Sequence, residues 1–125
     1  MLASLESKVI VVTGAGQGIG RALCQHLAAA GAKVIALSKS VEKLEELKNI
    51  CSTVETIPVD LKNWQNTRDI LSKLPQIDGL VNNAGVAIIK PFTELTEQDF
   101  DEYNMHSIYD VNFLNFISIF LVKHI

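Results

Sequence analysis

A glycine-rich segment that directly follows a short apolar run constrains this chain more than any other feature. Residues 8–13 read KVIVVT, a run rich in β-branched residues, and TGAGQGIG occupies residues 13–20. The run is too short for a stable helix and predicts a strand buried on both faces, as in a parallel sheet. Apolar residues at helical spacing then predict a helix over Gly18–Ala30 that stops at Gly31. The glycines therefore stand where a buried strand turns into a helix.

The rest of the chain continues this alternation of strands and helices. The further expected elements are a strand over Lys33–Ser38, a helix capped by Ser40 with Leu44 and Leu47 on its buried face, a strand over Val54–Val59, a helix over Asn63–Leu74, a strand over Gly79–Val81 and a helix that starts at Thr96. Regular alternation with short connections predicts right-handed crossovers and a doubly wound α/β fold. We expect four parallel strands in the order 3-2-1-4. With 125 residues, of which 48% are hydrophobic, residues 1–125 form a single domain or part of one.

The apolar stretch Val111–Val122 is expected to form a helix buried on more than one face, because its aromatic and branched residues surround a helical wheel. It is shorter than the roughly 20 residues that a membrane span requires. With the sheet ending at its fourth strand, that strand would be an edge, and the last helix would expose apolar surface. We therefore expect association or poor solubility for the isolated chain.

Charge and composition exclude several classes of function. The formal net charge is -3 and the lysines and acidic residues are scattered, which does not favour nucleic acid. The N-terminus lacks a basic start, so no secretory signal is expected and a cytoplasmic location is favoured. Cys24 and Cys51 show no CxxC spacing and are expected to be reduced thiols. No metal site is expected, and the histidines are interpreted as scattered surface residues: His26, His106 and His124.

Three glycines of the loop, at positions 14, 18 and 20, have distinct physical roles. Gly14 permits a tight turn, Gly18 lets an anion approach the backbone without a Cβ, and Gly20 lets the helix pack closely on the strand. Unpaired N–H groups and the helix dipole at the helix start favour a phosphate group. The alternative is a glycine-rich turn that binds no ligand.

The Gly-x3-Gly-x-Gly spacing, together with three later segments, resembles the short-chain dehydrogenase/reductase family and its Rossmann-type fold. The segments are Asp60 after the third strand, NNAG at residues 82–85 and YDVN at residues 109–112. The resemblance implies that Asp60 bonds the adenine amino group, that Asn82 braces the sheet, and that Asn112 holds a water in the proton relay. Taken alone, Asp60 could be a turn residue and Asn112 a polar break in a helix.

Three segments, VIALSKSVEKLEEL, VDLKNW and NNAGVAIIKPFTELTEQDFD, most resemble the dicarbonyl/L-xylulose reductases of that family. This resemblance implies reduction of a small carbonyl substrate with NADP(H), and a homo-oligomer for a complete protein. Membranes and nucleic acids are not expected as partners. The residues expected to contact the cofactor are Gly14, Gln17, Gly18, Ile19, Gly20, Ser38, Lys39, Asp60, Leu61, Asn83, Ala84 and Gly85.

The residues after the second strand favour NADP(H) over NAD(H). An NAD-preferring site places a carboxylate there, which bonds the ribose 2′-hydroxyl and repels a 2′-phosphate. This chain has Ser38, Lys39 and Ser40 instead, a cation and two hydroxyls suited to a phosphate. Two observations weigh against this interpretation: a lysine after a strand is often only a solvated charge, and Gln17 supplies no further basic group.

The resemblance also implies a catalytic serine and a Tyr-x-x-x-Lys motif, and neither tyrosine of this chain fits the motif. Tyr103 is followed four places on by Ser107, and Tyr109 by Phe113. We therefore interpret the chain as the cofactor-binding front half of a reductase, inactive alone. One alternative is a short product that binds NADP(H) without catalysis or modulates full-length subunits. Another is a structural or regulatory protein with a vestigial dinucleotide loop.

The position of Asn112 depends on the residues before it. Glu102–Ser107 resembles an insertion ahead of YDVN. Either this segment loops out, or it turns Asn112 away from the cofactor, because added helical residues rotate the face that follows.

Overall fold

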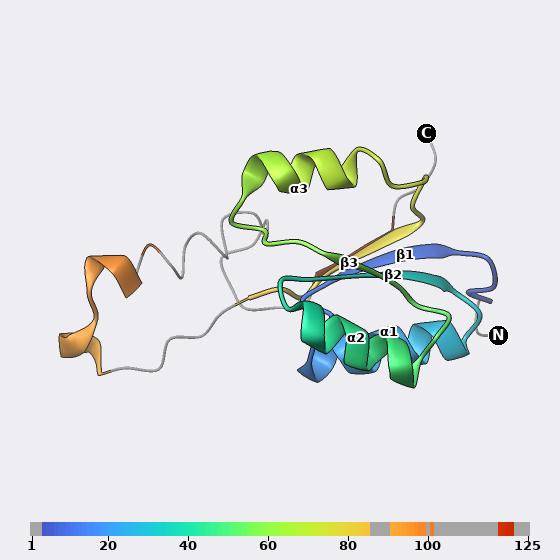
Figure 1. Cartoon of the computed structure of the whole chain (residues 1–125), viewed down its shortest axis with the longest axis horizontal. Helices are drawn as coiled ribbons and strands as arrows, with labels where there is room; N and C mark the ends of the chain where they lie inside the picture. The colour runs from blue at the N-terminus through green and yellow to red at the C-terminus, as the bar shows by residue number, and fades with distance from the viewer. Residues whose placement is uncertain (1–3, 86–90, 100, 102–117, 122–125) are drawn as a thin grey trace.

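The structure, a computed structural model, describes residues 4–85, 91–99, 101 and 118–121 (Figure 1). Its elements are, in chain order, β1 Val9–Thr13, α1 Gly18–Ala29, β2 Lys33–Ser38, α2 Val41–Ile50, β3 Glu55–Pro58, α3 Trp64–Leu71, β4 Gly79–Asn82, the 3-10 turn η1 Phe92–Glu94 and β5 Ser118–Leu121. Up to β4 the types and order of the elements confirm the alternation predicted from the sequence.

The strands form one sheet in the order β3-β2-β1-β4-β5. Strands β1 to β4 are parallel, with Val11 paired to Ile35 of β2 and to Leu80 of β4. The predicted order 3-2-1-4 is thus confirmed. Because these strands run in the same direction, their carboxyl ends meet at one rim of the sheet.

The sequence predicted a helix over Val111–Val122, and for the described part of that stretch, Ser118–Leu121, the prediction is wrong because these residues form strand β5. Ser118–Leu121 is extended and pairs antiparallel with β4, with Phe120 opposite Leu80. The sequence SIFL is rich in β-branched and aromatic residues, and the outer side of β4 offers unpaired backbone groups that an extended segment can satisfy. Strand β4 is therefore not the exposed edge that the sequence predicted.

The helices lie on both faces of the sheet, α1 and α2 on one and α3 on the other (Figure 1). Side chains alternate between two buried clusters because successive residues of a strand point to opposite faces. The cluster under α1 and α2 includes Val12, Val34, Cys24, Leu44 and Leu47. The cluster under α3 comprises Val11, Ile35, Leu37 and Val59, with half-buried residues of α3 and its flanks against it.

Capping side chains fix where the helices start. The Ser40 hydroxyl accepts a hydrogen bond from Lys43 N at 3.4 Å, and the Asn63 side chain accepts one from Asn66 N at 3.0 Å. Thr96 and Asp99 bond each other reciprocally, Asp99 N donating to Thr96 Oγ1 at 3.1 Å and Thr96 N to the Asp99 carboxylate at 3.0 Å. These contacts confirm the caps predicted at Ser40 and Thr96.

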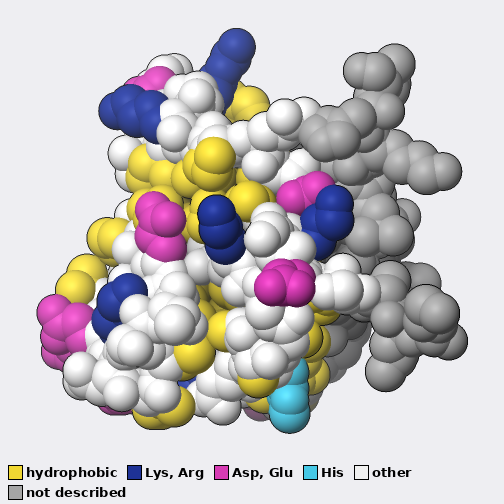
Figure 2. Space-filling model, turned by 90° about the vertical axis from the view of Figure 1, so that its right-hand side faces the viewer, with side chains coloured by type: hydrophobic (Ala, Val, Ile, Leu, Met, Phe, Trp, Pro, Cys, Tyr) yellow, Lys and Arg dark blue, Asp and Glu magenta, His cyan; other side chains and the backbone are white. Residues whose placement is uncertain are grey.

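The surface carries charges of both signs. Figure 2 views the end of the sheet opposite the carboxyl rim, where lysine and arginine side chains alternate with acidic ones between hydrophobic patches. In the part of the chain that the structure describes, no helix is long and apolar enough to cross a membrane.

Candidate functional site

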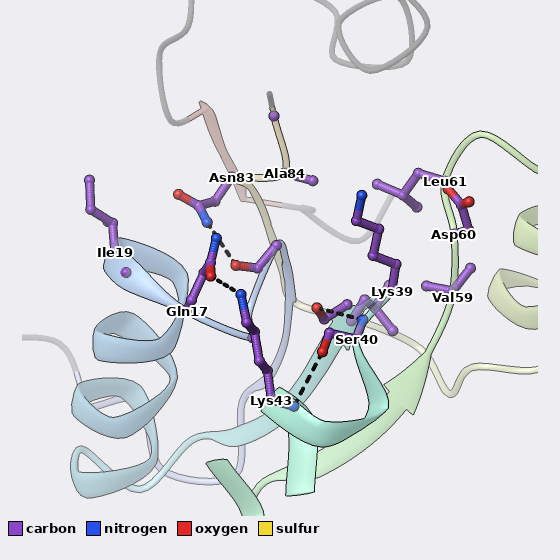
Figure 3. A pocket seen from close by; sticks show the side chains of 16 residues that line it. Gln17, Ile19, Lys39, Ser40, Lys43, Val59, Asp60, Leu61, Asn83 and Ala84 are labelled. Atoms are coloured by element: carbon purple, nitrogen blue, oxygen red, sulfur yellow. Dashed lines mark hydrogen bonds between the residues drawn. The ribbon is translucent and has the colours of Figure 1, made fainter. Parts of the chain in front are cut away.

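A cavity of about 310 Å³ lies at the carboxyl rim of the parallel strands (Figure 3). Residues that follow β1, β2, β3 and β4 line it, because all four strands end at this rim. The lining residues are Gly14, Gly16, Gln17, Gly18, Ile19, Leu37, Ser38, Lys39, Ser40, Lys43, Val59, Asp60, Leu61, Asn83, Ala84 and Gly85. The expected cofactor contacts thus lie together, apart from Gly20.

The glycine loop has the geometry that its sequence predicts. Gly14 and Gly18 have positive φ angles of 63° and 55°. A Cβ added to Gly18 would have no neighbour within 4 Å, so the loop backbone is open to an approaching group. A Cβ on Gly20 would lie 2.3 Å from the Gly14 carbonyl oxygen and 2.5 Å from Asn83 Nδ2. Gly20 is therefore a packing residue behind the cavity wall.

Thr13 joins the end of β1 to the end of β4. Its hydroxyl accepts hydrogen bonds from the backbone N–H groups of Asn83 and Ala84, both at 3.0 Å. The Asn83 side-chain amide in return donates to the carbonyl oxygens of Thr13 and Gly14, at 3.3 and 3.2 Å. The side chain that links β4 to the glycine loop is thus that of Asn83, one residue after Asn82, to which the resemblance gave the bracing role.

Sequence reasoning missed Thr13, although a hydroxyl residue directly before a loop glycine is a usable signal. It also missed Arg21, which connects the glycine loop to α2. Arg21 Nε donates to the Gly16 carbonyl at 2.9 Å, and Nη2 contacts Lys43 O at 3.2 Å and a Glu46 carboxylate oxygen at 2.7 Å. Lys43 and Glu46 lie on α2, a separate element, so no local pattern could indicate these two partners.

The segment after β2 brings hydroxyl and ammonium groups to the cavity. The Ser38 hydroxyl accepts a hydrogen bond from Ser40 N at 3.4 Å, while Lys39 is exposed at the cavity wall. Lys43, in the first turn of α2, is not among the residues that the sequence predicts to contact the cofactor. Lys43 is half-buried, lines the cavity, and donates from Nζ to Gln17 Oε1 (Figure 3).

Asp60 is both a turn residue and a wall of the cavity. Its carboxylate accepts a hydrogen bond from Lys62 N at 3.0 Å, and its carbonyl accepts from Asn63 N at 3.0 Å. These contacts fit the structural alternative that the sequence left open. Asp60 also lines the cavity beside Val59 and Leu61, at the end of the third strand.

The other expected residues have simple placements. Ile19 is 61% exposed and lies at the start of α1 on the cavity wall. Asn112 lies outside the residues that the structure describes. Within the described ranges, no group of three or more His, Cys, Asp or Glu residues could hold a metal ion.

The two cysteines lie away from the cavity, near each other on the α1 and α2 side of the sheet. Both are free thiols, Cys24 buried and Cys51 half-buried. Burial raises the pKa of the Cys24 thiol to about 12, and the nearby Cys51 adds to the effect. Cys24 therefore behaves as an apolar core residue at neutral pH.

Comparisons with known proteins agree with this geometry. Residues 8–122 match the family model for short chain dehydrogenases. The chain is 46% identical over 97 residues to L-xylulose reductase of Mesocricetus auratus, an alignment that covers 78% of this chain and 40% of that protein. It is 38% identical over 105 residues to carbonyl reductase (NADPH) 2 of Sus scrofa, covering 82% of this chain and 43% of that protein.

Among solved structures, the closed form of serine dehydrogenase complexed with NADP+ superposes with a TM-score of 0.72 at 30% identity. That match covers 79% of this chain and 42% of the other. The chain thus spans less than half the length of these relatives. With a doubly wound sheet, a glycine loop at its rim and a family match over nearly its whole length, the chain belongs to the short-chain dehydrogenase family.

Proposed function

We propose that this chain supplies the NADP(H)-binding half of a reductase that acts on small dicarbonyl or ketose substrates. The observation that carries the proposal is the composition of one cavity lining. It combines an open glycine loop with a lysine and two hydroxyls at the end of β2, where no carboxylate stands. The printed names of relatives support the substrate class, since they include an L-xylulose reductase and an NADPH carbonyl reductase.

The cavity fits the parts of a dinucleotide. Gly18 lines the cavity, has a positive φ and has open space where a Cβ would stand. This arrangement suits a pyrophosphate at the start of α1. Asp60, at the end of the third strand, suits the adenine amino group as a hydrogen-bond acceptor. Asn83, Ala84 and Gly85 form the wall that runs from the glycine loop past β4.

In this proposal, the residues at and after the end of β2 bind the 2′-phosphate and so favour NADP(H) over NAD(H). Lys39 supplies a positive charge, and the Ser38 and Ser40 hydroxyls supply hydrogen-bond donors. When bound, NADPH supplies the hydride for carbonyl reduction. The residues of this chain bind and orient it, and Asn112 is proposed as the holder of a relay water.

Cofactor titration tests this assignment. We expect the chain to bind NADPH more tightly than NADH, and Lys39→Asp to weaken NADPH binding by about ten- to a hundredfold, because a carboxylate would replace a charge-assisted phosphate contact. NADH binding should hold or improve. Lys33→Asp, at the opposite end of β2, is the matched control. The NADP(H) assignment is wrong if the chain binds both cofactors with equal affinity and Lys39→Asp changes neither affinity.

Catalysis requires groups beyond this cavity. Because no tyrosine of the sequence is followed by lysine four residues later, we propose that these 125 residues bind cofactor without turnover. Carbonyl-dependent oxidation of NADPH by the purified chain would contradict that. Sequencing the full transcript tests whether a serine and a Tyr-x-x-x-Lys motif follow downstream.

The same sequence observation supports a second candidate, a short product that binds NADP(H) and modulates full-length subunits. Co-purification with such subunits and a changed rate of carbonyl reduction would favour it. The expected homo-oligomer and cytoplasmic location stay predictions, to be measured by sedimentation and cell fractionation.

A further inference from the structure

Lys43 is held at the cavity by contacts with the N-cap of α2, with α1 and with the glycine loop. Its backbone N–H donates to Ser40 Oγ at 3.4 Å, and its carbonyl accepts from Arg21 Nη2 at 3.2 Å. Its ammonium reaches across to the glycine loop and donates to Gln17 Oε1. Figure 3 shows the Lys43 side chain extending from α2 toward Gln17, with Lys39 on the other side of Ser40. The ammonium position is therefore set by the packing of loop and helix.

The positive charge of Lys43 is not neutralised by a carboxylate among the residues that the structure describes. Its side-chain partner is the neutral amide oxygen of Gln17, whereas Arg21 is paired with Glu46 at 2.7 Å. An ammonium group has three donors, so one bond to Gln17 leaves others for a ligand. Lys43 also lines the same cavity as Lys39 and the two serine hydroxyls. The lining of the cavity thus includes two lysines, Lys39 and Lys43, and one acidic residue, Asp60.

We propose that Lys43, positioned by Gln17, is a second cation for the 2′-phosphate of NADP(H) and sets cofactor preference together with Lys39. This inference rests on the proposed function. A phosphate monoester carries up to two negative charges at neutral pH, which one exposed lysine neutralises only in part. Two cations that approach from β2 and from α2 complete the neutralisation, and the Ser38 and Ser40 hydroxyls add donors.

Isothermal titration with NADP+ and NAD+ tests the proposal on the whole chain. We expect Lys43→Gln to weaken NADP+ binding by about tenfold and to leave NAD+ binding unchanged, since only NADP+ carries the 2′-phosphate. Lys33→Gln, an equivalent change at the amino end of β2, should alter neither. Loss of the same factor for both cofactors, or no loss for NADP+, would overturn the assignment to Lys43.

Gln17→Glu tests the positioning role with a different prediction. A carboxylate at this position would neutralise Lys43 and repel the 2′-phosphate, so NADP+ binding should weaken more than in Lys43→Gln. NAD+ binding should weaken less, because NAD+ meets the new charge only through the pyrophosphate that both cofactors share. Lys43→Arg should restore most of the NADP+ affinity that Lys43→Gln loses. Thermal melting of each variant shows whether it is folded, and the ratio of the two affinities reports specificity separately from stability.

The outcomes separate this inference from the proposed function. If the wild-type chain prefers NADP+ and Lys39→Asp abolishes the preference while Lys43→Gln has no effect, the function stands and the role of Lys43 is wrong. If the wild-type chain shows no preference for NADP+, the proposed function itself fails. A fall in the salt dependence of NADP+ binding in Lys43→Gln would support direct contact with the phosphate, because each ion pair contributes to that dependence.

Discussion

The helices on the two faces of the sheet differ in how many side chains they bury, and the glycine loop of the candidate site precedes a helix of the more buried pair. Under α1 and α2, Cys24, Leu44 and Leu47 are at most 2% exposed. On the opposite face, α3 keeps Trp64 50% exposed and Leu71 43% exposed, and Thr67 is its one buried residue. The glycine loop leads into α1, and Lys43 belongs to α2.

The deeper burial of α1 and α2 explains how the backbone of the cavity wall is held in place. A binding wall must keep its backbone groups in place without a ligand, and tight burial of the adjoining helices provides that. Helix α1 starts at the glycine loop, and α2 starts beside it, joined to it through Arg21. The α3 face supports the sheet but contributes no lining residue from the helix itself.

Truncating one leucine on each face gives the largest contrast. Leu47→Ala should lower the free energy of unfolding by about 3 kcal/mol, because it leaves a cavity at a fully buried position. Leu71→Ala, on α3, should cost less than about 1 kcal/mol, since the side chain already contacts solvent. Urea unfolding measures both. Equal costs would break the comparison and show that α3 is as tightly packed as α2.

Two glycines at the start of α1 differ in how closely the helix packs around them. Gly20→Ala should cost about 2 kcal/mol, because its Cβ would meet the Gly14 carbonyl at 2.3 Å and push α1 from the sheet. Gly18→Ala should cost about 1 kcal/mol, from its positive φ alone, since its Cβ meets open space. Chemical denaturation ranks the two, and a reversed ranking would mean that α1 is not held closely at Gly20.

The smallest effect, when measured between pH 8 and pH 10, is a pH dependence from Cys24. Its pKa is raised by burial from 9.0 to about 12, so above pH 9 the unfolded state loses the thiol proton while the folded state keeps it. Stability should therefore fall between pH 9 and 12, by about 1 kcal/mol from pH 8 to pH 10. Cys24→Ala should lack this component, with Cys51→Ala as the control. An identical pH dependence in wild type and Cys24→Ala would show that solvent reaches the interior of this face.

Local patterns predicted the sheet and most of the cavity wall. The second strand, Lys33–Ser38, agrees with β2 residue for residue, because a buried β-branched run bounded by turn residues has one good interpretation. The Ser40 cap and the three glycine positions agree for similar reasons. The third helix was predicted to reach Leu74 but ends at Leu71, where turn-like hydrogen bonds replace the helical ones.

The features that sequence could not predict depend on contacts between distant elements. Strand β5 exists because β4 offers a partner, and a hydropathy pattern over 111–122 contains no information about that partner. A helical wheel sorts Lys43 by its position around α2, yet the glycine loop lies beyond the end of that helix and receives the ammonium. Arg21 likewise contacts Lys43 and Glu46 of α2, which only the folded topology brings near.

The outer side of β3 has a consequence for how copies of this chain meet. Val59 N donates to Ser38 O at 2.9 Å, so Val59 faces β2, and by alternation Thr56 and Pro58 turn their backbones to the free edge. Proline has no N–H group, so at that position the edge cannot donate to an added strand. This edge is thus a poor template for intermolecular β-pairing, which protects the chain from aggregating through it.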